Sequence, residues 1–175
     1  SLRRPSSAKE AAIAARMLGI LAFFVGAEKD DNVSRIQQIT MKIIKTGRQE
    51  AVRVAACEVT TLYFFVCNSD IEMLISYVEF LKDLLQNHDQ MPASLRASLL
   101  EGFGLLFSTL PPRDRRIMTN SVADGISMMA SFLEDENYAV RYAAGENCAM
   151  MFEMEGYPDD VDMSDLISLI QSYSI

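Results

Sequence analysis

Residues 51–58 read AVRVAACE and residues 139–146 read AVRYAAGE, so six of the eight positions are identical at an offset of 88 residues. A related stretch, SLRASLLE, lies between them at residues 94–101, and SAKEAA begins at residue 7. The four stretches start at residues 7, 51, 94 and 139, with spacings of 44, 43 and 45 residues. A self-similarity at this period predicts a protein built from stacked helical repeats.

Each repeated stretch begins a predicted helix, over residues 7–25, 51–67, 92–110 and 139–154. Between these helices, apolar residues at helical spacing predict further helices, and no segment shows the alternation of a strand. We therefore expect an all-α fold, a right-handed α-solenoid of armadillo/HEAT-like helix pairs, with eight helices in four pairs and each unit beginning at a repeated stretch. Residues 1–175 are expected to form one domain. We interpret it as a fragment of a longer solenoid whose truncated ends could self-associate.

Helix ends are marked by residues with known capping preferences. Gly26 and Gly47 follow predicted helices as C-cap residues, and Pro111-Pro112 stops the third repeated helix. Predicted N-caps are Asn32, Asp70, Asp114 and Ser164. Gly102 and Gly104 fall inside a helical pattern, where they allow close packing or a kink.

One basic residue recurs near the start of every repeated helix, in the column Lys9, Arg53, Arg96 and Arg141. These cations could form a ladder that binds phosphate or an acidic peptide. They could instead tie each repeat to its neighbour, which is the interpretation that we favour because buried polar groups at such junctions need partners. The parallel column of Glu58, Glu101 and Glu146 has the same two interpretations.

Charge is distributed unevenly along the chain, which has a net charge of −8. Residues 1–57 carry ten basic and five acidic residues, whereas residues 118–175 carry one basic and eleven acidic residues. Opposite ends of the molecule could therefore meet different partners. The candidate partner-binding residues are the basic side chains Lys42, Lys45 and Arg48 near the N-terminus, together with Arg113, Arg115 and Arg116 in a predicted connector.

The sequence has no pattern of residues that indicates catalysis or metal binding. Cys57, Cys67 and Cys148 have no paired spacing and are expected to be reduced core thiols in the cytoplasm or nucleus. Four late aspartates, Asp159, Asp160, Asp162 and Asp165, lack the glycine and glutamate of a calcium loop. His88, the single histidine, lies in a polar connector. We expect no enzyme activity, no cofactor, no metal and no membrane span, since the apolar runs are short.

The stretch VRYAAGE at residues 140–146, followed by MFE at residues 151–153, resembles a signature of the interferon-related developmental regulator family. The resemblance extends over nearly the whole chain, although Tyr142 and Met150 replace residues that are usually aliphatic or small in the family. It also implies that earlier solenoid turns are missing, because the chain opens on the second helix of a repeat. Arg141, Ala143, Ala144, Gly145 and Glu146 then carry over as fold determinants.

The resemblance implies a non-catalytic regulator of gene expression that is cytoplasmic, nuclear or both. One hypothesis is a scaffold that binds other proteins as a transcriptional co-regulator. The alternative is a module that binds the ribosome or rRNA through the basic N-terminal third and represses translation. The net acidity argues against general nucleic-acid affinity, whereas the basic third permits a local RNA contact.

Overall fold

All regular structure in the described part of the chain is helical. The computed structural model describes residues 7, 9, 10, 12–14, 16, 17, 30–67, 70–87, 91–119 and 122–155. Residues 9–17 are helical wherever they are described. The later elements are α2 (Asp30–Thr46), α3 (Glu50–Cys67), α4 (Ile71–Gln86), α5 (Ala93–Thr109), α6 (Pro112–Thr119), α7 (Val122–Ala130), the 3-10 turn η1 (Ser131–Glu134) and α8 (Tyr138–Glu155). The prediction of an all-α fold is confirmed.

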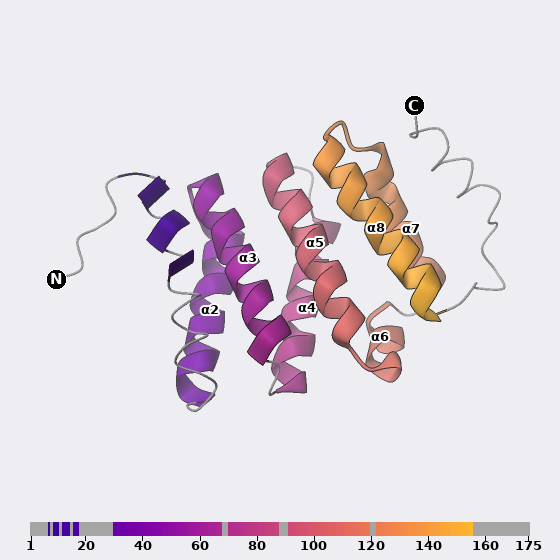
Figure 1. Ribbon diagram of the computed structural model, residues 1–175, viewed down its shortest axis with the longest axis horizontal. Helices are drawn as coiled ribbons and strands as arrows, with labels where there is room; N and C mark the ends of the chain where they lie inside the picture. The colour runs from indigo at the N-terminus through magenta and orange to yellow at the C-terminus, as the bar shows by residue number, and fades with distance from the viewer. Residues whose placement is uncertain are drawn as a thin grey trace.

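The helices pack in two layers. Three long helices, α3, α5 and α8, lie side by side as one layer, and α4 and α7 lie behind α5 and α8 (Figure 1). Within the first layer α3 packs on α5, and α5 packs on α8. Each element thus contacts its neighbours along a row, which is the arrangement of a stacked helical repeat.

The helices pair differently from the prediction that each pair begins with a repeated helix. Between helices that follow one another in the chain, each repeated helix packs mainly on the helix before it, so that α2 packs on α3, α4 on α5, and α7 on α8. The repeated helix is therefore the second of its pair. The sequence pattern locates helices and their apolar faces. The helix before a repeated helix and the helix after it both have an apolar face, so the pattern does not show which of the two is its partner.

Helix ends follow the predicted chemistry in most places. Asp70 is the N-cap of α4, and its carboxylate accepts hydrogen bonds from the backbone N–H groups of Glu72 and Met73 at 2.9 and 3.2 Å. Gly47 follows α2, and its N–H donates to the Ile43 carbonyl at 2.8 Å. These contacts satisfy backbone groups that a helix terminus leaves without a partner.

Two predicted N-caps are wrong. Asn32 lies inside α2, which begins at Asp30, and Asp114 lies in the first turn of α6. Pro112 does end the preceding helix, but it also starts α6, because proline fits the first turn of a helix. Gly26 and Ser164 lie outside the described residues.

The core lies between the two layers and continues from α3 to α8. The ring of Phe64 on α3 stacks on Tyr77 of α4 with centroids 5.0 Å apart, and Phe103 and Phe107 stack within α5. The paired alanines at the start of the repeated helices are buried where helices meet: Ala55, Ala56, Ala143 and Ala144. Small side chains there let the helix backbones approach one another closely.

The closest approach between α5 and α8 depends on Gly104. Asn147 of α8 is buried, and its side-chain amide donates to the Leu100 carbonyl of α5 at 2.9 Å. A Cβ at position 104 would lie 1.8 Å from the amide oxygen of Asn147. Gly104 therefore leaves the space that the Asn147 side chain occupies, as the close-packing interpretation of this glycine expects.

Candidate functional site

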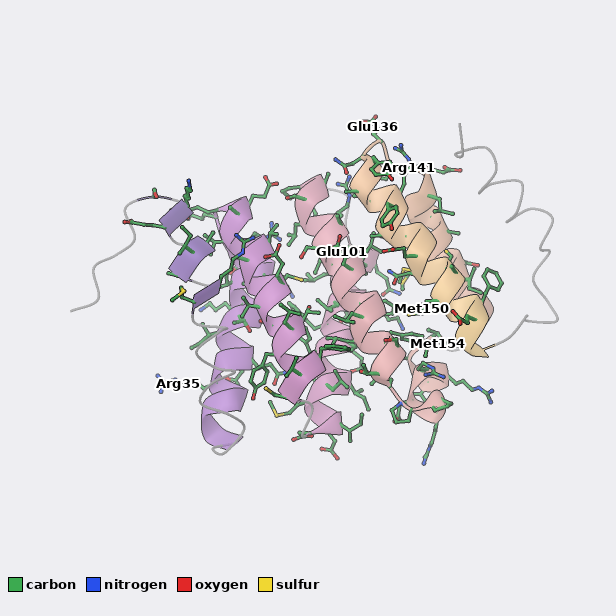
Figure 2. All side chains as sticks on the ribbon, viewed as in Figure 1. Arg35, Glu101, Glu136, Arg141, Met150 and Met154 are labelled. Atoms are coloured by element: carbon green, nitrogen blue, oxygen red, sulfur yellow. The ribbon has the colours of Figure 1, made fainter. Side chains whose placement is uncertain are left out.

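The basic column at the helix starts lies at junctions between helices. Arg53 donates to the carbonyl of Ile44 at 2.6 Å and to that of Lys45 at 3.5 Å, in the last turn of α2. Arg141, at the start of α8 beside Glu136 (Figure 2), donates to the carbonyls of Asp135 and Glu136 at 2.8 and 2.9 Å. These guanidinium groups satisfy carbonyl oxygens at the ends of preceding segments.

Arg96 is the member of the column that meets a carboxylate. Its guanidinium pairs with Asp135 at 2.6 Å, and the two side chains are 18% and 10% exposed. It also donates to the Met91 carbonyl just before α5. The pair links the start of α5 to the segment between η1 and α8. Lys9, the first residue of the column, is exposed.

The basic connector expected at residues 113–116 is a helix, and its three arginines do not share a surface role. Arg115 is buried, with 7% of its surface exposed, and donates to the Leu110 carbonyl at 2.9 Å. It therefore supports the end of α5, and its assignment to partner binding is wrong. Arg113 and Arg116 are exposed on α6. The pattern misled because a short polar helix that opens with proline resembles a loop in sequence.

The other basic candidates lie at the end of α2. Lys42 and Lys45 are exposed in its last turns, and Arg48 is exposed directly after it. Arg35 is also exposed and points away from the bundle (Figure 2).

The glutamate column forms a row across the first layer. Glu58, Glu101 and Glu146 come from α3, α5 and α8, and Glu101 lies near the middle of α5 (Figure 2). Partial burial raises the pKa of the Glu101 carboxyl, and the negative charges of Glu58 and Glu146 raise it further. The carboxylates of Glu58 and Glu146 are thus each close enough to repel that of Glu101. Glu58 forms an ion pair with Arg16 at 2.9 Å, whereas Glu146 interacts with the Tyr142 hydroxyl.

An open groove of about 280 Å³ lies beside this row, between α3 and α5. Its walls are mostly apolar, and it is lined by Glu58, Thr61, Leu62, Ser98, Glu101, Gly102 and Leu105. Thr61 contributes a buried hydroxyl oxygen that has no well-formed hydrogen bond within the described residues. Its polar neighbours are the Cys57 thiol, one turn earlier on α3, and the Tyr77 hydroxyl on α4.

Apolar side chains continue from the groove along the same helices. Leu62, Phe65 and Val66 of α3 are 47%, 45% and 60% exposed. Leu62, Leu105 and Met150 recur with the spacing of Glu58, Glu101 and Glu146, which places an apolar row one turn beyond the acidic row. Met150 and Met154 lie on the later turns of α8 (Figure 2). The candidate site is this surface of α3, α5 and α8, which we call the acidic-apolar face.

Sequence reasoning found the acidic row of this face but missed the apolar row and the groove. The repeat spacing that aligned the glutamates also aligns Leu62, Leu105 and Met150, so the signal was present. That Leu62 is exposed and that Leu105 and Met150 are only partly buried could not be inferred, because leucine and methionine at helical spacing are usually core residues.

The buried thiols are held in their neutral form. Burial raises the pKa of Cys57 to about 11 and that of Cys148 to about 12. Cys67, near the end of α3, is only partly buried. Because the thiolate is the reactive form, the two buried cysteines are inert at neutral pH.

We therefore expect iodoacetamide to modify Cys67 alone in the folded protein at neutral pH. Peptide mapping by mass spectrometry after brief alkylation measures this directly, and the unfolded protein in denaturant, where all three thiols are modified, is the control. Alkylation of Cys57 or Cys148 as fast as Cys67 under native conditions would contradict the buried placement.

Within the described residues no group of three or more histidine, cysteine, aspartate or glutamate side chains could hold a metal ion. The four late aspartates and His88 lie outside them. No helix in the same part of the chain is long and apolar enough to cross a membrane.

The row of paired helices, with surface positions that recur at the repeat spacing, defines an all-α helical-repeat protein. A family model described as interferon-related developmental regulator (IFRD) matches residues 1–168, and the chain belongs to this family. Membership places it broadly among regulators of gene expression. No curated protein matches the chain, and no solved structure matches it.

Proposed function

We propose that the chain is a non-catalytic, armadillo/HEAT-like scaffold that binds other proteins through the acidic-apolar face and acts as a transcriptional co-regulator, in the nucleus, the cytoplasm or both. The observation that carries the proposal is the groove between α3 and α5, together with the exposed side chains of Leu62, Phe65 and Val66 beside it. Exposed apolar side chains that gather beside a groove are typical of a surface that a protein partner covers.

Affinity purification tests the proposal with and without ribonuclease. The full-length protein is expected to retain a nuclease-resistant set of transcriptional regulators, and the double variant Leu62→Lys/Phe65→Lys is expected to lose that set. Ile117→Lys is the matched control, because Ile117 is an exposed apolar residue on α6, a helix that is not part of this face. Equal recovery of these regulators by the double variant and the control would refute binding through the acidic-apolar face.

A second candidate function is binding to the ribosome or rRNA. It is favoured by the exposed basic side chains of Lys42, Lys45 and Arg48 at the end of α2. Each phosphate contact would make the affinity fall with salt, by a log–log slope of roughly −0.7 to −0.9. The variant Lys42→Glu/Lys45→Glu/Arg48→Glu should then abolish co-sedimentation with ribosomes while its thermal unfolding stays unchanged. Unchanged co-sedimentation and salt dependence would exclude this surface as the contact.

A further inference from the structure

Within the described residues, only one glutamate of the row Glu58, Glu101 and Glu146 forms an ion pair with a basic side chain of the chain itself. Arg16, from the first helical segment, reaches Glu58 across the junction between neighbouring helices with two hydrogen bonds of 2.9 and 3.1 Å. The residues at the same spacing before Glu101 and Glu146 are Val59 and Gly104, which carry no charge. The described helices therefore supply an arginine to the first glutamate of the row and none at the equivalent positions of the next two.

The groove beside Glu101 offers a second, independent feature. Leu62 and Leu105 line it, and the buried Thr61 hydroxyl at its wall lacks a well-formed hydrogen bond within the described residues. Gly102 lets α5 approach α3 closely at this point, because a Cβ there would lie 2.6 Å from the Thr61 oxygen. An occupant can thus bury an apolar side chain in the groove while a basic side chain meets Glu101.

We propose that the acidic-apolar face binds an extended, arginine-bearing segment of a partner protein that crosses α5 and α8. This inference rests on the proposed scaffold function and names the chemistry of the partner. Charge complementarity favours an arginine-bearing partner. Within the chain, Arg16 forms an ion pair with Glu58, and arginines of the partner form the equivalent ion pairs with Glu101 and Glu146.

The spacing of the rows defines the form of the segment. Packed helices lie roughly 8–10 Å apart, so successive glutamates of the row are separated by about that distance. A polyproline II segment advances about 9 Å in three residues and presents every third side chain on one face. Arginine at every third position therefore meets Glu101 and Glu146 in turn, and an apolar residue between them meets the Leu62, Leu105 and Met150 row.

Two synthetic peptides of identical composition test the spacing on the full chain. The first contains four repeats of Arg-Leu-Pro, and the second contains the same residues as two blocks of Arg-Arg-Leu-Leu-Pro-Pro. Fluorescence anisotropy is expected to show roughly tenfold tighter binding of the first peptide, equivalent to about 1.4 kcal/mol. Equal affinity for both peptides, or no binding of either, would overturn the proposal.

Charge variants test the site. Glu101→Gln/Glu146→Gln should weaken binding of the first peptide roughly tenfold, whereas Glu72→Gln/Glu79→Gln, which neutralises two exposed glutamates of α4, should leave it unchanged. Equal effects of the two pairs would place the contact elsewhere. If the peptides fail but Leu62→Lys/Phe65→Lys still loses its regulators, the scaffold function stands and only the partner chemistry is wrong.

Discussion

Replacing Arg96 with methionine is expected to lower the free energy of unfolding by about 3 kcal/mol. Methionine keeps most of the apolar stem of arginine but leaves the Asp135 carboxylate, which is 10% exposed, without its partner at 2.6 Å. The hydrogen bond to the Met91 carbonyl is lost as well. A largely buried carboxylate that has lost its cationic partner is more costly than a missing surface ion pair, because it cannot regain its hydration.

Arg53→Met is the matched control for this prediction. Arg53 occupies the equivalent position of the previous repeat, but its side chain donates to the backbone carbonyls of Ile44 and Lys45. Its loss is expected to cost about 1 kcal/mol. Urea denaturation followed by far-ultraviolet circular dichroism measures both variants. If Arg96→Met cost no more than Arg53→Met, the Asp135 pair would contribute nothing to stability.

Two glycine-to-alanine substitutions are expected to have opposite signs. Gly104→Ala should destabilise the protein by about 2 kcal/mol, because the added Cβ lies 1.8 Å from the Asn147 oxygen and forces that buried side chain from its hydrogen bond to Leu100. Gly145→Ala should stabilise it by about 0.5–1 kcal/mol. The Cβ there meets only the Leu133 side chain at 3.8 Å, so the gain in helix propensity remains.

The same denaturation experiment measures both glycine variants, and the double variant Gly104→Ala/Asn147→Ala tests the cause. Alanine at position 147 removes the colliding atoms, so the double variant should lose less stability than the sum of the two single variants. Strict additivity would show that Gly104 and Asn147 do not compete for this space.

Three residues of the resemblance to the interferon-related developmental regulator family are buried or lie at a junction between helices. Ala143 and Ala144 are buried, and Arg141 donates to the carbonyls of Asp135 and Glu136. Such positions are recognisable in a sequence because packing between stacked helices restricts them to small residues or to one donor of the right length. Glu146, which belongs to the same signature, is exposed on the acidic-apolar face, where packing sets no comparable restriction.

The sequence by itself determined the helical class, the period of the repeat and the family, because spacing and small-residue pairs are local properties of the chain. It also placed the Asp70 cap, whose contacts lie within one helical turn. The tertiary structure decided which helices pair, that Arg115 is buried while Arg113 is exposed, and that Leu62 and Leu105 line a groove beside the acidic row. These properties depend on contacts between residues far apart in the chain, and the same helical periodicity is compatible with either a buried or an exposed leucine.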